Sequence, residues 1–107
     1  MTDDCPILAE TTTSYGMRVV LFEDTWLLHI LTPQNGHPEL APHLPVVLAT
    51  VTQPDHREPD LRLSRERFFK QHVGPSQWLM VVVDFEGEPP RIVTALGYRQ
   101  SPSEWTP

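Results

Sequence analysis

Cysteine is almost missing from this chain of 107 residues, which contains Cys5 alone. A single cysteine excludes an internal disulfide and a thiolate metal cluster. As a nucleophile, Cys5 would need a positioned base, and no candidate base lies near it in the sequence. We therefore interpret Cys5 as a free thiol in a terminal segment.

Long apolar runs are missing as well. No stretch approaches the ~20 residues that a membrane-spanning helix requires. The first ten residues, MTDDCPILAE, are acidic and lack the basic and apolar regions of a secretory signal. We expect a soluble protein of the cytoplasm with no membrane partner.

Positive charge is scarce, because 8 Lys and Arg residues face 14 Asp and Glu residues, giving a formal net charge of -6. This balance argues against a protein that coats nucleic acid, since phosphate binding requires concentrated positive charge. The exception is the segment 57–72, which holds five cations and three anions. The segment predicts a local basic face on an acidic protein.

Common catalytic and metal-binding motifs are also absent. The sequence contains no GxGxxG, P-loop, GxSxG or CxxC pattern, so large classes of nucleotide enzymes, serine hydrolases and redox proteins have no support. Metal-ligand residue types occur in two close pairs, His37 with Glu39 and Asp55 with His56. Neither pair has the spacing of a recognised metal motif, so we expect no metal and no cofactor.

The composition that remains is typical of one small globular domain. The hydrophobic fraction is 39% and the charged fraction 21%, enough for a single modest core. We expect a single α+β domain over residues 15–99. A flexible lead-in, residues 1–14, would precede it, and a loose tail, residues 100–107, would follow it.

The apolar pattern predicts one main helix packed on an antiparallel sheet of about four strands. The helix is expected over 38–52, and its regular part begins only near Pro45 because prolines disturb the first turns. The surest strands form a hairpin over 78–98, and the first of them is apolar enough to be covered on both faces. Further strands are expected at 17–23 and within 61–73, residues 25–31 form a strand or a short helical turn, and residues 53–60 form a polar loop.

Two of the five histidines are candidates for chemistry. His29 lies in an apolar run, where it is either a packing residue or an acid or base whose pKa lies near neutrality. His37 directly precedes the expected helix, where it either faces an anion held by free backbone N–H groups or has no role. The remaining histidines are expected to lie in solvent: His43, His56 and His72.

Two arginines of the basic segment point the same way. Arg65 and Arg67 are two residues apart on an expected strand, so they share a face, whereas Lys70 faces the other way unless a bulge intervenes. Paired guanidinium groups suit phosphate, whose oxygens accept forked hydrogen bonds. The alternative is a solvated face with salt bridges to Glu58, Asp60 and Glu66.

The last strand carries two hydroxyl side chains. Thr94 and Tyr98 are expected on one face together with Ile92 and Leu96. The Tyr98 hydroxyl can both donate and accept a hydrogen bond. This face is either a packed strand with satisfied hydroxyls or one wall of a site that borders the basic strand.

The order of short segments resembles a known superfamily. The chain shows WLLHI, HPEL, a helix followed by QPD, then RERFFK, WLMVVVDF and RIVTALGY. This order over residues 17–98 resembles small nuclease domains of the barnase, EndoU, colicin and RelE-like superfamily, which includes BrnT-type toxins. The resemblance implies one main helix packed on a curved antiparallel sheet, which agrees with the helix and antiparallel sheet that the apolar pattern predicts.

The resemblance also implies an activity, which is metal-independent RNA cleavage by attack of the 2′-hydroxyl on the adjacent phosphate. His29 or His37 matches the N-terminal acid or base. Arg67 and Lys70 match the basic residues that hold the phosphate. Thr94 matches the polar residue of the last strand, with Tyr98 just beyond it.

The expected function is therefore an endoribonuclease-like domain, the toxin of a toxin–antitoxin pair, with RNA and an antitoxin protein as partners. The alternative is a catalytically inactive member that acts as a protein-interaction module. An exposed sheet edge would also allow a homodimer.

Overall fold

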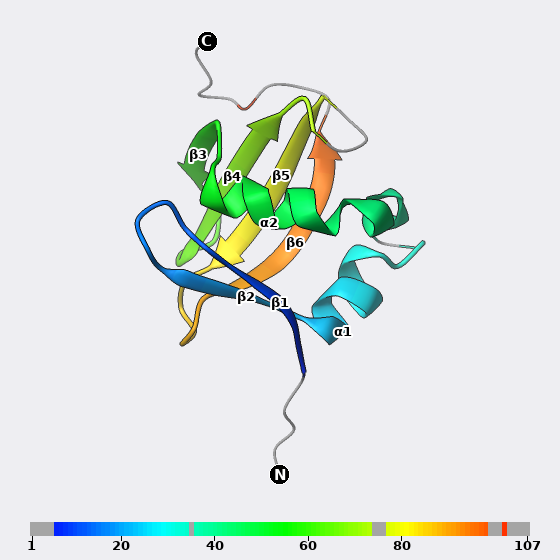
Figure 1. Cartoon of the computed structure of the whole chain (residues 1–107), viewed down its shortest axis with the longest axis horizontal. Helices are drawn as coiled ribbons and strands as arrows, with labels where there is room; N and C mark the ends of the chain where they lie inside the picture. The colour runs from blue at the N-terminus through cyan, green and yellow to red at the C-terminus, as the bar shows by residue number, and fades with distance from the viewer. Residues whose placement is uncertain (1–5, 35, 74–76, 99–101, 103–107) are drawn as a thin grey trace.

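The computed structural model describes residues 6–34, 36–73, 77–98 and 102. Within these residues, six strands form one mixed sheet in the order β1-β2-β6-β5-β4-β3, and the helix α2 crosses one face of it (Figure 1). The elements are, in chain order, β1 (Ile7–Thr12), β2 (Arg18–Phe22), α1 (Glu23–Thr25), the π-helix η1 (Trp26–Ile30), the 3-10 helix η2 (Pro38–His43), α2 (Leu44–Thr52), β3 (His56–Pro59), β4 (Arg65–Gln71), β5 (Trp78–Asp84) and β6 (Arg91–Tyr98).

The expected α+β class is confirmed, but the expected number of strands is wrong. The two additional strands lie at the edges of the sheet, where β1 pairs with β2 and β3 pairs with β4. β1 falls in the expected lead-in of residues 1–14, and β3 falls in the expected polar loop. An edge strand is exposed along one side, so it needs little of the apolar alternation that identifies a central strand.

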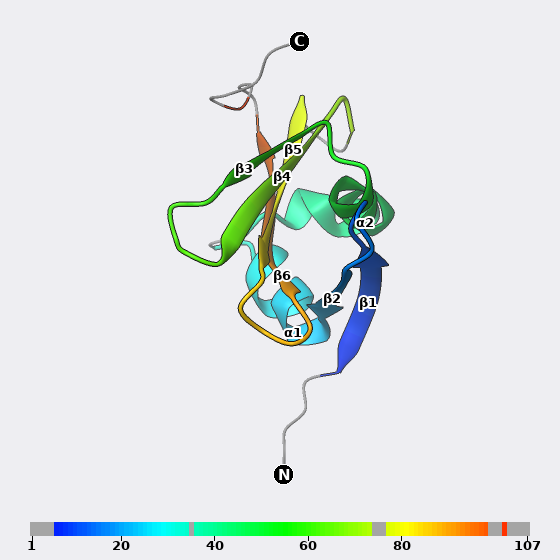
Figure 2. The same ribbon diagram turned by 90° about the vertical axis from the view of Figure 1, so that its left-hand side faces the viewer.

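The β1–β2 hairpin joins the rest of the sheet through a narrow connection. β2 and β6 are parallel and share one pair, Val20 opposite Arg91, with a 3.0 Å hydrogen bond from the Val20 N–H to the Pro90 carbonyl. The hairpin therefore turns away from the other four strands, and α2 packs in the angle between them (Figure 2). The Thr11 hydroxyl donates to the Leu48 carbonyl of α2 at 3.1 Å and fixes this packing.

The helix expected over 38–52 is confirmed in two parts. The first part is the 3-10 turn η2, which contains Pro42, and regular α-helix begins at Leu44. Pro45 is tolerated because the first turn of a helix has no intrahelical use for its N–H. Val47 and Val51 are fully buried against the sheet. Residues 25–30 are helical rather than extended, and Leu31 ends the π-helix. Among the described residues, none of the helices has the length and apolar character of a membrane span.

The sheet is apolar on both faces along β5. All seven residues of β5 are buried, as expected for this strand. One face packs against α2, η1 and η2 and includes Phe68, Val81 and Ile92. The opposite face, called the far face from here on, has its own apolar cluster of Phe69, Trp78, Met80 and Val82.

A bulge in the β5–β6 pairing decides which residues of β6 reach the far face. Val82 lies opposite Thr94, but Val83 lies opposite Ile92, so Val93 is an extra residue in β6. Ile92 consequently enters the helix-covered core, while Thr94 follows Val82 onto the far face. The expectation that Ile92 and Thr94 share a face is wrong, because a bulge inverts the alternation.

Candidate functional site

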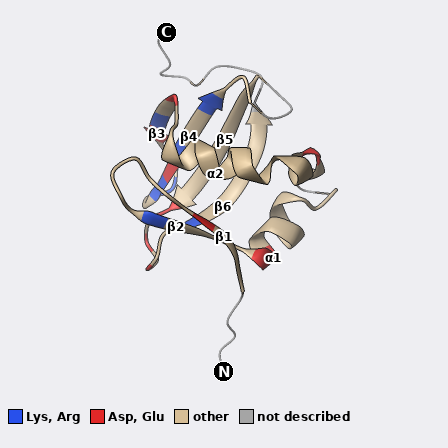
Figure 3. Cartoon of the chain, viewed as in Figure 1, with Lys and Arg blue, Asp and Glu red and all other residues tan. Residues whose placement is uncertain are grey.

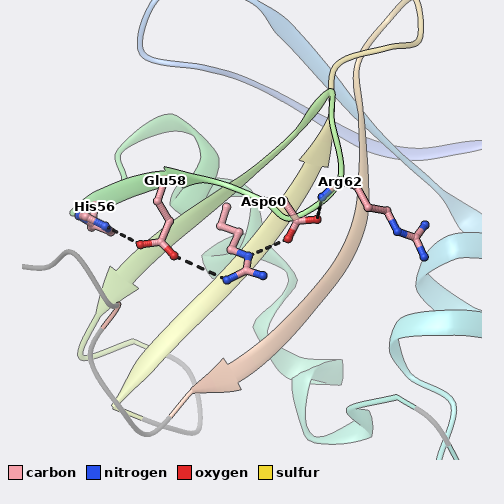
Figure 4. Close-up of polar contacts among 5 residues, drawn as sticks. His56, Glu58, Asp60 and Arg62 are labelled. Carbon is pink, nitrogen blue, oxygen red and sulfur yellow. Dashed lines mark hydrogen bonds and ion pairs between the residues drawn. The ribbon is translucent and has the colours of Figure 1, made fainter.

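Charged residues gather along β3 and β4, as the colouring of the ribbon in Figure 3 shows. On the far face they form a network of His56, Glu58, Asp60 and Arg67, part of which is drawn in Figure 4. Residues 56, 58 and 60 alternate along β3 and its end, so their side chains emerge on one side. Arg67 joins them because it lies directly opposite Glu58 in the neighbouring strand.

The contacts form a continuous chain. His56 Nε2 lies 3.0 Å from Glu58 Oε1, and Glu58 Oε2 lies 3.6 Å from an Nη of Arg67. The Nε–H of Arg67 donates to Asp60 Oδ1 at 2.7 Å. The side chains of His56 and Glu58 are only 15% and 10% exposed, so solvent screens their interaction less than at an open surface.

Asp60 also fixes the tip of the β3–β4 hairpin. Its carboxylate accepts the Arg62 N–H at 3.3 Å, and its own N–H donates to the Arg65 carbonyl at 3.0 Å. Burial alone would raise the pKa of Asp60, but the hydrogen bonds from Arg67 and from the Arg62 N–H outweigh it. The pKa of Asp60 therefore lies below its usual value.

Arg65 forms a second pair beside this network. It lies opposite Asp84, and its Nε donates to the Asp84 carboxylate at 3.3 Å. Asp84 also accepts the Glu86 N–H at 2.9 Å and the Ser64 hydroxyl at 3.0 Å. The Glu86 N–H is the largest cause of the lowered pKa of this buried carboxyl.

The two arginines therefore share a face, as predicted. Both are paired with carboxylates, as in the interpretation that made them salt-bridge partners rather than phosphate ligands. Glu58 and Asp60 face Arg67, while Asp84 faces Arg65. The third carboxylate expected in these salt bridges, Glu66, pairs instead with Arg57 at 2.7 Å.

Lys70 does not belong to this group. The β4–β5 register is unbroken, so Lys70 faces away from Arg67, as its place in the strand predicts. Its ammonium group donates to the Gln53 carbonyl at 2.7 Å, just beyond the last residue of α2. A cation there satisfies a free carbonyl and suits the negative end of the helix dipole.

His29 and His37 lie close to each other but on the helix side of the sheet. The His37 N–H donates to the Ile30 carbonyl, and Ile30 belongs to the helix-covered core. A Cβ atom at Gly36 would collide with the main-chain oxygens of His29 and Ile30, so only glycine allows this close turn. His37 Nδ1 lies 3.3 Å from Glu39 Oε2. The sheet separates this turn from Arg65 and Arg67.

Thr94 is the predicted residue that does share the far face with the arginines. It lies opposite Val82, which lies opposite Arg67. Two strand spacings separate Thr94 from Arg67, a distance of about 10 Å. Tyr98 pairs with Trp78 at the end of β6, but its side chain lies outside the described residues.

His56 is the histidine that the sequence did not identify. It was expected in solvent, but its side chain is largely covered, and its ring centroid lies 5.8 Å from that of Phe69. The available signal was the alternation of His56, Glu58 and Asp60, which suits a strand rather than a loop.

One pocket lies next to the site. A pocket of about 360 Å³ lies beside Asp84, between Phe22 and Arg91, under the β5–β6 loop. Among the described residues, no group of three or more His, Cys, Asp and Glu side chains is arranged to hold a metal ion.

Comparison with known proteins identifies no relative. No protein-family model matches the chain, and neither the curated proteins nor the solved structures provide a significant match. The function is therefore inferred from the chemistry of the side chains and from the resemblance in the sequence.

Proposed function

We propose that the chain is a metal-independent endoribonuclease-like domain that acts on RNA at the far face of its sheet. The observation that carries the proposal is the His56–Glu58 pair, 3.0 Å apart, directly beside Arg67. A histidine oriented by a carboxylate and placed next to a cation has the parts needed for proton transfer near a phosphate.

Each part has a role in attack by the 2′-hydroxyl. His56 takes the hydroxyl proton as the 2′-oxygen bonds to phosphorus, the bond to the 5′-oxygen breaks, and water protonates the leaving oxygen. Glu58 holds the imidazole, and Arg67 stabilises the charge that develops on the phosphate oxygens. Thr94 lies on the same face of the sheet, where its hydroxyl contacts the bound RNA. The need for a 2′-hydroxyl selects RNA over DNA.

Two further observations support this proposal. The α+β architecture, a helix packed on a largely antiparallel sheet, agrees with the fold that the resemblance implies. The basic strand β4 pairs with β5, next to the β5–β6 hairpin, so its arginines lie inside the sheet beside the strand that carries Thr94's partner Val82. The biological role proposed with this activity is the toxin of a toxin–antitoxin pair.

The direct test is cleavage of total RNA by the purified chain in the presence of a metal chelator. We expect cleavage by the unchanged chain and its loss in His56→Ala. Cleavage should be retained in His72→Ala, because His72 is exposed and follows the end of β4, five residues beyond Arg67, the residue opposite Glu58. His29→Ala and His37→Ala test the histidines that the resemblance favours. No cleavage by the unchanged chain, together with normal growth of expressing cells, would exclude the proposal.

A protein-interaction module without catalysis is the second candidate, and one observation favours it. Arg65 and Arg67 are already paired with carboxylates, so neither guanidinium faces solvent without a counter-charge. A stable protein partner, combined with no RNA cleavage at any pH, would establish this function instead.

A further inference from the structure

The place where an anion would bind Arg67 is already taken by a carboxylate of the same chain. Asp60 Oδ1 accepts the Arg67 Nε–H at 2.7 Å, and Glu58 lies on the other side of the guanidinium. The carboxylates of Glu58 and Asp60 bring two negative charges against the one positive charge of Arg67. A phosphate approaching this group would be repelled rather than attracted.

Asp60 differs from Glu58 in where it is attached. Glu58 lies within β3, whereas Asp60 directly follows β3 and begins the hairpin tip, residues 60–64. The apolar side chains of the tip contribute little to holding it, since Leu61 and Leu63 are each 93% exposed. Figure 4 shows the Arg62 side chain directed away from Glu58 and Asp60. Displacing the tip would therefore cost hydrogen bonds but almost no buried apolar area.

We propose that Asp60 is an internal competitor for an anion site of the phosphate class at Arg67. The anion binds when the Asp60 carboxylate leaves the guanidinium, so the hairpin tip sets the affinity of the site. This inference rests on the proposed function, because it concerns the same arginine. Its chemical basis is the ability of a guanidinium to form forked, charge-assisted hydrogen bonds with either a carboxylate or a phosphate.

The test removes the negative charge of Asp60 but keeps a hydrogen-bond acceptor in its side chain. In Asp60→Asn, the amide oxygen can still accept the Arg62 N–H, and Asp60→Ser provides a second variant that can also cap this turn. The matched control is Asp55→Asn, which removes the same charge from an exposed carboxylate that accepts the Gln71 N–H. Thermal unfolding checks that each variant of the full chain is folded.

The measurement is a titration of the full chain with inorganic phosphate, following the Nε–H resonance of Arg67 by NMR. We expect the apparent Kd for phosphate to fall about tenfold in Asp60→Asn and to change less than about twofold in Asp55→Asn. Equal changes in both variants, or no phosphate response at Arg67 in either folded Asp60 variant, would overturn the proposal. Phosphate binding strengthened at Arg67 without any RNA cleavage would support the inference while contradicting the proposed function.

Discussion

The imidazole of His56 lies 3.0 Å from the carboxylate of Glu58, two residues further along the same edge strand. The pair is largely covered although β3 is an edge strand of the sheet that the described residues form. Arg67 and Phe69 from β4 lie opposite Glu58 and His56 and provide much of this cover. The geometry of a candidate acid–base group thus depends on the β3–β4 register, which the sequence alone indicates only weakly.

The first prediction concerns Glu58, which contacts both His56 and Arg67. Glu58→Gln should lower the free energy of unfolding by about 1–3 kcal/mol, because it leaves a partly buried guanidinium with a weaker partner. Urea denaturation measures the change. The control is Glu39→Gln, where the carboxylate is 47% exposed beside His37 and the expected loss is below about 0.5 kcal/mol. Equal losses in both variants would show that burial of the network has no energetic effect.

The second prediction concerns acid stability. The pKa of Asp84 is lowered in the folded chain, mainly by the Glu86 N–H, from a usual value of 3.8. A lowered folded pKa stabilises the protein above the unfolded pKa, and this stability is lost as the pH falls through the folded pKa. The free energy of unfolding should therefore decrease below about pH 4.

Asp84→Asn tests the source of this decrease. The amide cannot titrate, so urea denaturation between about pH 2 and 7 should show a shallower loss of stability at the acid end. Asp24→Asn, at an exposed position in α1, serves as the comparison. An acid-end slope unchanged in Asp84→Asn would contradict the assigned role of this carboxyl.

Much of the fold was predictable because its central elements have strong patterns. β5 was identified from its continuous apolar run, and the regular part of α2 from its apolar spacing and prolines. β1 and β3 were missed because edge strands are only partly buried, and HREP in particular contains three titratable residues and a proline.

The site was predictable only in part, for a geometric reason. Alternation correctly placed Arg65 and Arg67 together and Lys70 on the opposite face. It could not place Thr94 relative to Ile92, because the extra residue at Val93 shifts the pairing without any glycine or proline to mark it. His56 could be recognised only once its segment was known to be a strand.

The third prediction concerns the turn that joins η1 to His37. Gly36→Ala should destabilise the chain by about 3 kcal/mol or more, because the added Cβ meets the main-chain oxygens of His29, Ile30 and Thr32. Backbone atoms cannot rotate away as a side chain can. Gly16→Ala is the contrast, since a Cβ there meets nothing within 4 Å and the cost arises from its φ of +91° alone. That cost should be about 1 kcal/mol.

The fourth prediction concerns the exposed tip of the β3–β4 hairpin. Leu61 and Leu63 are each 93% exposed, so the double variant Leu61→Ser, Leu63→Ser should change the free energy of unfolding by less than about 0.5 kcal/mol. Any weak self-association through these leucines should decrease, which sedimentation at increasing protein concentration measures.

The matched control replaces one leucine, Leu40, whose surroundings differ. Leu40 is fully buried in the helix-covered core, so Leu40→Ser should cost several times more stability than the double change at the tip. Removing a buried leucine side chain leaves a cavity and typically costs about 2–5 kcal/mol, and the serine hydroxyl adds an unpaired polar group. If the tip variant proved as destabilising as Leu40→Ser, the leucines would have to pack against the protein in solution. The hairpin tip would then be held by buried apolar contacts, and Asp60 could not leave Arg67 at the low cost argued above.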